Sequence, residues 1–253
     1  MYSRNYGFLL KNLVLRDFKV RYRNMSLGIL WSLVNPLVMM AVLTFVFTVI
    51  FPNTPDDFYL MALSGIVIYN FFSFGWLSAT ISVYSNSELV KRVPMPRELL
   101  PIATVLANSL HFLIQIGLLI VLVLHAGYGV NQYWFLLPVI FLLELIFVCG
   151  LSLITSALDV YFRDMRYVVE SLGTLLFWLV PIFYSFAMIP QEYRSIYLYN
   201  PIAAVVLACR AIMMENRMPP TSLLLKLHLV SFGCLVTGIF VFHRLKRRFA
   251  DYL

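Results

Sequence analysis

Six long apolar runs separated by shorter polar segments dominate the pattern along the chain. A helix needs roughly 20 consecutive apolar residues to cross the hydrocarbon core of a bilayer, and in lipid only a helix satisfies its backbone hydrogen bonds within one segment. The pattern therefore predicts an all-α integral membrane protein in which residues 1–253 form one domain. The predicted spans are residues 29–51, 58–84, 99–129, 133–158, 167–189 and 222–243.

Residues 1–28, before the first span, predict an amphipathic helix. Polar side chains recur at i, i+4, i+7 and i+11 from Asn12, which places them on one helical face, and leucines fill the opposite face. Such a helix lies along the cytoplasmic membrane interface, either as a plain anchor or as a docking surface for a partner, and the two roles are compatible. The charged residues predicted to act at this interface are Arg16, Asp17, Lys19, Arg21 and Arg23, of which Asp17 and Arg21 fall among the apolar positions.

The segment between the fifth and sixth spans, residues 190–221, contains the apolar stretch IYLYNPIAAVVLACRAIMM. Pro201 and Arg210 interrupt this stretch, so it is too broken for a seventh span. A seventh span would also place the basic C-terminal tail on the opposite side of the membrane. We therefore expect short reentrant helices that dip into the outer membrane face, which is tolerated where backbone is buried in protein.

Composition argues against a water-soluble fold, and the distribution of charge predicts how the chain is oriented in the membrane. The chain is 61% hydrophobic and 12% charged, against about 25% charged residues in soluble domains. Most of the 19 Lys and Arg residues lie before the first span, after the second and fourth spans and in the C-terminal tail. Basic residues favour the cytoplasmic side, so both termini are predicted to be cytoplasmic. The net charge of +7 then suits anionic lipid headgroups and requires no nucleic acid.

The segment SNSELVKRVPMPRELLP, between the second and third spans, interrupts the apolar pattern most sharply. Ser85 and Glu88 have the spacing of a capping box, which predicts a helix start, and Pro94 predicts its end. Pro96 and Pro101 suit the first turn of the next helix. Residues 85–98 are thus either a structured connector or a stiff element that transmits force from a soluble partner.

Three polar positions within the spans are considered for function. Glu144 lies in the middle of the fourth span, and intramembrane carboxyl groups often serve function, although it could simply hydrogen-bond a neighbouring helix. His111 and Gln115, one turn apart, are interpreted as a polar packing pair. The sequence carries no HExxH, CxxC, GxSxG or phosphate-binding GxxxxGK[ST] motif. We therefore expect no metal site, cofactor or catalytic residue in this chain.

Four segments resemble one family of transporters. LVKRVPMPRELLP (Leu89–Pro101) is similar to the cytoplasmic coupling segment of the transmembrane subunits of ATP-binding-cassette (ABC) exporters for O-antigen, capsular polysaccharide or teichoic acid. RYRNMSLGILWSLVNPL (Arg21–Leu37) resembles the entry into the first span of the same type-2 ABC exporters. YFRDM (Tyr161–Met165) resembles their second cytoplasmic turn, and YNP (Tyr199–Pro201) their external segment. The resemblance covers essentially the whole chain in the same six-span order.

The resemblance implies a permease that works with a separate ATPase, which would hold the ATP and Mg²⁺. Residues 85–98 would be the coupling helix in a groove of that ATPase, braced by the N-terminal helix. Arg163 and Asp164 would form a second cytoplasmic contact or its internal brace. The positions that match the coupling motif are Glu88, Lys91, Arg92, Pro96 and Arg97.

The implied function is export of a lipid-linked polysaccharide across the bacterial inner membrane by two copies of this chain and two ATPases. Aromatic side chains suit such a path because every sugar ring has an apolar C–H face that can stack on an aromatic ring. In channels for single-stranded nucleic acid, aromatic side chains likewise tolerate varied sequence, because every base offers a flat face. A drug or small-lipid exporter of the same superfamily remains open, as do an ion-coupled secondary transporter and a membrane enzyme acting on lipid-linked sugar. The glycan-channel candidates are Trp31, Tyr69, Phe72, Trp76, Phe177, Trp178 and Tyr184.

Overall fold

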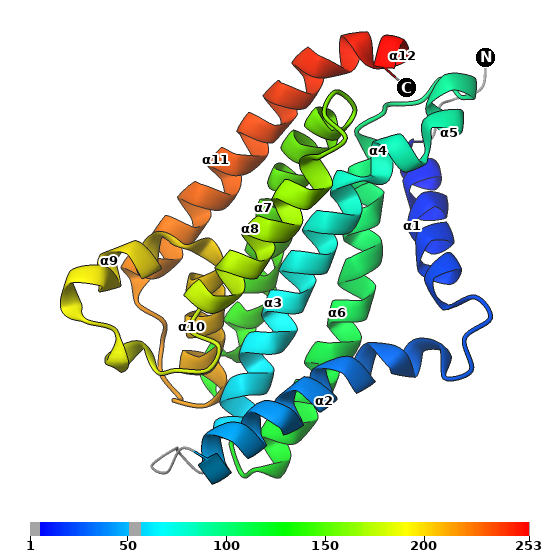
Figure 1. The fold of residues 1–253 in the computed structure, drawn as a ribbon. Coiled ribbons are helices and arrows are strands. Elements are labelled where there is room, and N and C mark those ends of the chain that lie inside the picture. The colour runs from blue at the N-terminus through cyan, green and yellow to red at the C-terminus, as the bar shows by residue number, and fades with distance from the viewer. Residues whose placement is uncertain (1–5, 51–56, 253) are drawn as a thin grey trace.

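A computed structural model describes residues 6–50 and 57–252, and this part of the chain is helical without any strand (Figure 1). Short 3₁₀ or π turns flank several of the helices. The helices are α1 (Tyr6–Tyr22), α2 (Trp31–Phe45), α3 (Phe58–Thr80), α4 (Ser82–Ser85), α5 (Ser87–Arg92), α6 (Leu99–His125), α7 (Leu137–Asp159), α8 (Met165–Leu179), α9 (Gln191–Tyr199), α10 (Pro201–Met213), α11 (Thr221–Leu245) and α12 (Phe249–Tyr252).

Five helical segments in the described part of the chain are long and apolar enough to cross a membrane. They correspond to the first, second, third, fourth and sixth predicted spans, with ends displaced by a few residues. The second prediction, residues 58–84, is divided at Ile81 into α3 and α4. The five segments are Gly28–Ile50, Phe58–Thr80, Leu99–His125, Gln132–Asp159 and Thr221–Arg248.

The fifth predicted span, residues 167–189, is not a single spanning helix. Its helical part, α8, has 15 residues and is therefore about 22 Å long at 1.5 Å per residue, short of the ~30 Å hydrocarbon core. The helix stops because Val180 is extended, with φ −84° and ψ 136°, as is favoured before a proline. Pro181 follows directly.

The buried side chain of Arg210 holds the turn that follows α8. From α10, its Nη1 donates to the carbonyl of Pro181 at 2.6 Å and its Nη2 to the carbonyl of Ile182 at 3.0 Å. The same guanidinium donates to the Met61 carbonyl at 2.7 Å and to the Ser64 hydroxyl at 3.2 Å, both on α3. One side chain thus supplies the donors that backbone carbonyls need where the helix is interrupted.

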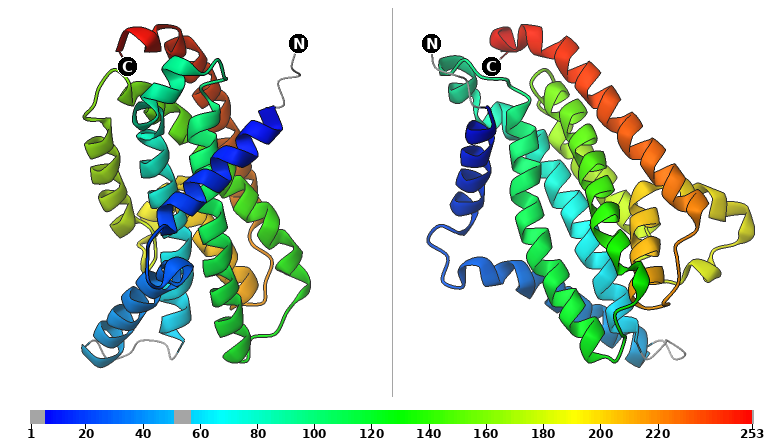
Figure 2. Two further views of the ribbon diagram at one scale, coloured as in Figure 1. Left: turned by 90° about the vertical axis from the view of Figure 1, so that its right-hand side faces the viewer. Right: turned by 180° about the vertical axis from the view of Figure 1, so that it is seen from behind.

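Two short helices occupy residues 190–221 in place of a seventh span. The side chain of Asn200 caps α10 by accepting from the amide of Ile202 at 3.0 Å, and Pro201 occupies the first turn, where it costs no hydrogen bond. Helix α10 is buried along most of its length and packs beside the lower parts of α3, α7 and α11 (Figures 1 and 2). The depth of these helices in a bilayer stays a prediction.

Helix α3 is the centre of the bundle and α2 lies at its edge. In the most apolar 18-residue stretch of α3, 72% of the residues are buried, whereas only 6% are buried in the corresponding stretch of the span that contains α2. Helix α2 crosses the lower half of the molecule obliquely in Figure 1 and in both panels of Figure 2. The start of α1, α5, the α7–α8 turn and α12 all lie at the opposite end, as expected if these charged segments share one side of a membrane.

Helices α7 and α11 approach closely through two glycines. A Cβ at Gly150 would lie 2.6 Å from the backbone carbon of Cys234, and one at Gly238 would lie 2.4 Å from the carbonyl oxygen of Gly150. Small residues allow this backbone approach, which gives apolar helices their van der Waals contact in lipid. The pairing joins the end of the chain to the middle of the bundle.

We expect Gly150→Ala to lower the free energy of unfolding by about 1–3 kcal/mol, because the added methyl group has to separate two packed backbones. The measurement is thermal unfolding of the purified protein in detergent. Gly233→Ala, also on α11, is the matched control, since a Cβ there meets no heavy atom within 4 Å and alanine favours a helix by up to about 1 kcal/mol. Equal effects of the two substitutions would contradict the packing argument.

We expect Arg210→Met to destabilise the fold, because each backbone carbonyl left without a donor costs about 1–3 kcal/mol. Thermal unfolding and limited proteolysis in the turn after α8 measure the loss. Arg217→Met is the control, since Arg217 forms an exposed ion pair with Glu215 and such pairs contribute at most about 1 kcal/mol. A wild-type melting profile for Arg210→Met would show that the turn holds without the guanidinium.

Candidate functional site: the α5 end of the bundle

Helix α5 is anchored by apolar residues and presents charged ones to the outside. Val90 is buried, and Leu89 packs against the same apolar cluster. On the outer side, Arg92 and Glu88 form an ion pair of 2.8 Å, with 79% and 71% of their side chains exposed. Lys91 is also exposed. Three of the predicted coupling residues therefore form a charged surface on a fixed helix.

The predicted end of α5 is confirmed, but its predicted start is wrong. Val93 is extended before Pro94, with φ −112° and ψ 121°, as the proline requires. The helix begins at Ser87 after Asn86, and no side chain caps it, so Ser85 and Glu88 form no capping box. The Asn86 amide instead donates backward to the carbonyl of Ser82 at 2.7 Å.

Arg97, also predicted to couple, faces inward to the C-terminal segment. Its Nη1 donates to the Lys246 carbonyl at 2.7 Å, and its guanidinium lies 5.7 Å from the centre of the Phe249 ring, within cation–π range. The Nζ of Lys246 in turn lies 3.2 Å from a carboxylate oxygen of Glu98. We call these four residues the C-terminal latch. Pro96, the remaining coupling candidate, is half-buried beside it, and its carbonyl accepts from the amide of Leu99.

The α7–α8 turn contacts both α4 and the C-terminal segment. The guanidinium of Arg163 lies 5.0 Å from the centre of the Tyr84 ring, and the side chain is exposed, so its role as an outer contact or as an internal brace stays a prediction. The Tyr161 hydroxyl donates to the Leu245 carbonyl at 2.7 Å, and Asp164 is exposed. The two predicted cytoplasmic segments therefore belong to one end of the molecule, and α11 and α12 connect them.

Helix α1 packs against α6 through the charged residues that fell on its apolar face. The hydroxyl of Thr104 donates to Asp17 at 3.0 Å, and Arg21 donates to Asn108 at 2.7 Å. The Tyr22 hydroxyl lies 2.5 Å from Nδ1 of His111. The remaining charged positions of the predicted interface helix, Arg16, Lys19 and Arg23, are exposed.

The three polar positions considered within the spans, His111, Gln115 and Glu144, do not contact one another through hydrogen bonds in the described part of the chain. His111 contacts α1, and the Gln115 amide donates to the Ser32 carbonyl at 2.8 Å, so the predicted pair does not form. Glu144 is fully buried, and none of the described residues hydrogen-bonds its carboxyl oxygens. The described residues also contain no cluster of three His, Cys, Asp or Glu that could hold a metal.

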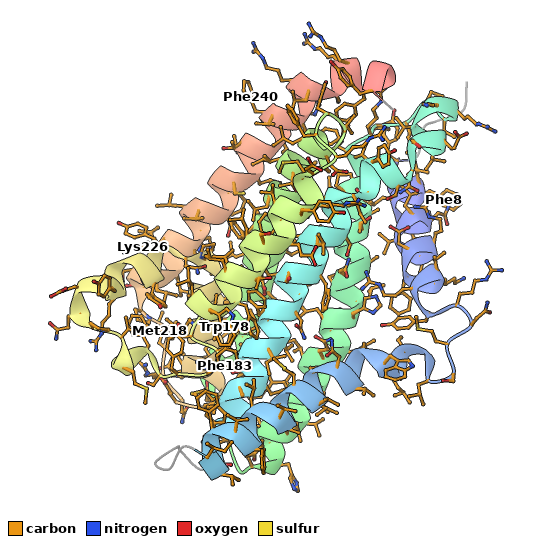
Figure 3. The ribbon with its side chains drawn as sticks, viewed as in Figure 1. Phe8, Trp178, Phe183, Met218, Lys226 and Phe240 are labelled. Carbon is orange, nitrogen blue, oxygen red and sulfur yellow. The ribbon has the colours of Figure 1, made fainter. Side chains whose placement is uncertain are left out.

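The aromatic candidates divide into core and surface residues. Tyr69, Phe72 and Trp76 are at most 5% exposed; the Tyr69 hydroxyl donates to the Gly173 carbonyl, and the Trp76 indole donates to Thr155 at 3.2 Å. These three therefore belong mainly to the core, although Tyr69 also lines a small pocket between α3 and α8. The accessible candidates are Trp31, 47% exposed, and Trp178, 65% exposed (Figure 3), together with the partly buried Phe177 and Tyr184.

Five apolar spans with a charged structure at one end define a multi-pass membrane protein. The family model described as "ABC-2 type transporter" matches residues 9–214, and the chain belongs to this family. The resemblance to type-2 ABC permeases is thereby confirmed.

Curated relatives match over nearly the full length of both chains. The O-antigen export system permease protein RfbA of Klebsiella pneumoniae is 32% identical over 98% of this chain and 97% of its own. The protein of the same name from Myxococcus xanthus is 31% identical over 97% and 95%. The polysialic acid transport protein KpsM of Escherichia coli is 26% identical over 81% and 80%.

Phe249→Ala is expected to release the C-terminal latch. Phe249 is 0% exposed, and truncation of a buried Phe typically costs about 3–5 kcal/mol. Hydrogen exchange of residues 246–252, followed by mass spectrometry, should rise together with the loss of thermal stability. Phe240→Ala on the outer face of α11, where the ring is 64% exposed, should leave both unchanged. Protection of residues 246–252 at the wild-type level in Phe249→Ala would contradict the latch.

Proposed function

We propose that this chain is the channel-forming membrane subunit of an ATP-driven exporter that moves a lipid-linked polysaccharide out of the bacterial cytoplasm. The observation that carries the proposal is the near full-length match to proteins named O-antigen export system permeases in two organisms. In this proposal the α5 end lies in the cytoplasm and the spans lie in the inner membrane. Energy comes from a separate ATPase, because the sequence has no phosphate-binding loop.

The contacts of α5 suit transmission of force from that ATPase. A push on the exposed Glu88–Arg92 face passes through the prolines 94 and 96 directly into α6, which starts at Leu99. The C-terminal latch joins the same linker to the end of α11. One docking site therefore acts on two spans, and the glycine contact with α7 extends the effect of α11 to the centre of the bundle.

A second copy of the chain completes the proposed pathway. The core around α3 is filled by packed side chains, so we place no continuous glycan path through a single copy. Apolar side chains of α2 remain exposed on the bundle edge, among them Val38, Val42 and Phe45. Two copies related by a two-fold axis bury the same patch on both partners and place the glycan path between them.

The accessible aromatic residues suit a sliding glycan. Trp31 on α2 and Trp178 on α8 present exposed ring faces, and the Trp178 ring lies 5.6 Å from that of Phe183 (Figure 3). Flat rings bind the apolar faces of successive sugars without a deep pocket, as aromatic side chains do for successive bases. Tyr69, Phe72 and Trp76 would instead keep α3 in place behind this surface.

We expect the double substitution Glu88→Arg with Arg92→Glu to abolish glycan export and to lower export-coupled ATPase activity in vesicles that contain the chain and its genetically neighbouring ATPase. The reversal keeps an i, i+4 pair within α5 but inverts the charge pattern that the ATPase would contact. Like charges brought together across the interface with the ATPase would strongly weaken its association with α5.

The matched control is Glu215→Arg with Arg217→Glu, which reverses an exposed pair at the other end of the bundle. We expect this control to export glycan at the wild-type rate. If the α5 reversal also exports at the wild-type rate, α5 is only a connector and the coupling role is refuted.

A further inference from the structure

A largely apolar pocket that also contains several hydrogen-bonding groups lies between the end of α1 and helices α2, α3 and α6. Its volume is about 230 Å³, below the 300–1,000 Å³ typical of sites for drug-sized ligands. The lining contains aromatic rings, amides and one guanidinium, but no carboxylate. A pocket of this size and chemistry suits a single ring that has both an apolar face and hydroxyl groups.

One wall of the pocket is fixed by hydrogen bonds between its own residues. Asn108 accepts from Arg21 and donates to the carbonyl of Thr104 at 2.8 Å. His111 contacts the Tyr22 hydroxyl, and its ring stacks on Phe18 with centres 4.9 Å apart. These groups are satisfied, so this wall is preorganised.

The opposite walls contain two amides that are not satisfied. Asn70, half-buried near the middle of α3, and Asn35, exposed on α2, both line the pocket. Neither side chain hydrogen-bonds to any of the described residues. Neither amide is among the fully buried groups without a partner, so both are open to a ligand in the pocket and can donate to it and accept from it.

Each unsatisfied amide has an aromatic ring one helical turn away on the same lining. Trp31 and Asn35 are spaced i, i+4 on α2, and Asn70 and Phe74 have the same spacing on α3. Residues at this spacing lie on one helical face. Two helices therefore present the same combination to one space, namely a ring for stacking and an amide that both donates and accepts.

We propose that this pocket binds one sugar ring, with Asn35 and Asn70 hydrogen-bonded to its hydroxyls and Trp31 stacked on its C–H face. The inference rests on the proposed function and deepens it, because it gives the glycan a defined subsite beside α1. The pocket joins α1 to α2, and ring binding there would therefore fix the entry into the first span. Asn35 and Asn70 are specificity-determining residues of this subsite.

The test uses the full chain in nanodiscs, prepared with a detergent that carries no sugar, and labelled with 5-fluorotryptophan. The ¹⁹F resonance of Trp31 is assigned by its loss in Trp31→Phe. The probe is the oligosaccharide mixture released by mild acid from the surface polysaccharide of the native cells. Parallel titrations use inorganic phosphate and nanodiscs enriched in phosphatidylglycerol.

We expect the oligosaccharide to shift the Trp31 resonance saturably and Asn70→Leu to weaken this binding at least about tenfold, equivalent to 1.4 kcal/mol. Asn12→Leu, an exposed amide on α1 outside the pocket, should bind like the wild type. No shift with the oligosaccharide, unchanged binding by Asn70→Leu, or a shift only with phosphate or phosphatidylglycerol would overturn the proposal.

Export is measured separately, in vesicles that contain the same variants together with the ATPase, and this second readout distinguishes failure of the subsite from failure of the proposed function. If Asn70→Leu neither binds the oligosaccharide differently nor exports less glycan than the wild type, the subsite is wrong and the exporter stands. If the wild-type chain with its ATPase exports no glycan at all, the proposed function fails whatever the Trp31 resonance does.

Discussion

Backbone carbonyls inside an apolar bundle need donors, and the end of α8 is where this constraint shapes the molecule most. A continuous helix would satisfy its carbonyls by itself, but Pro181 stops α8 after 15 residues. The guanidinium of Arg210 supplies the missing donors to Pro181 and Ile182 and also binds α3. The chain can therefore turn back within the bundle, and α9 and α10 have a place beside α3, α7 and α11.

The opposite end of the bundle combines charged and apolar contacts into one body. Helix α5, the start of α6, the α7–α8 turn and the C-terminal segment contact one another through Arg97, Tyr161 and Phe249. The Glu88–Arg92 pair remains on the outside of this body. A body of this kind can move as a unit when a partner pushes on α5, whereas a soft loop would absorb the push.

The sequence predicted the spans better than it predicted the contacts between them. Length and hydropathy identified five spans because each is an uninterrupted apolar helix. The fifth predicted run is not confirmed as a single spanning helix, because α8 ends before Pro181, and the effect of this proline on the preceding residue was the available signal. Asp17 and Arg21 stood out on the apolar face of α1, and both proved to bind α6.

Other features depend on tertiary structure that a single sequence does not contain. The latch joins residues about 150 positions apart, and no local pattern marks Glu98 or Phe249 as the partners of Lys246 and Arg97. Aromatic content indicated stacking surfaces, but only packing separates the buried Phe72 from the exposed Trp178. Similarly, the sequence does not distinguish Asn70, whose amide faces the pocket without a hydrogen-bond partner among the described residues, from Asn108, whose amide is hydrogen-bonded.

Site-specific photo-crosslinking in living cells that express the chain with its neighbouring ATPase shows directly whether α5 is the ATPase contact. A photoreactive amino acid replaces Lys91 on the outer face of α5 or, in a separate strain, Arg217 at the other end of the bundle. We expect a crosslinked product with the ATPase from position 91 and none from position 217. Absence of the product at position 91, or equal products from both positions, would contradict the assignment of α5 as the ATPase contact.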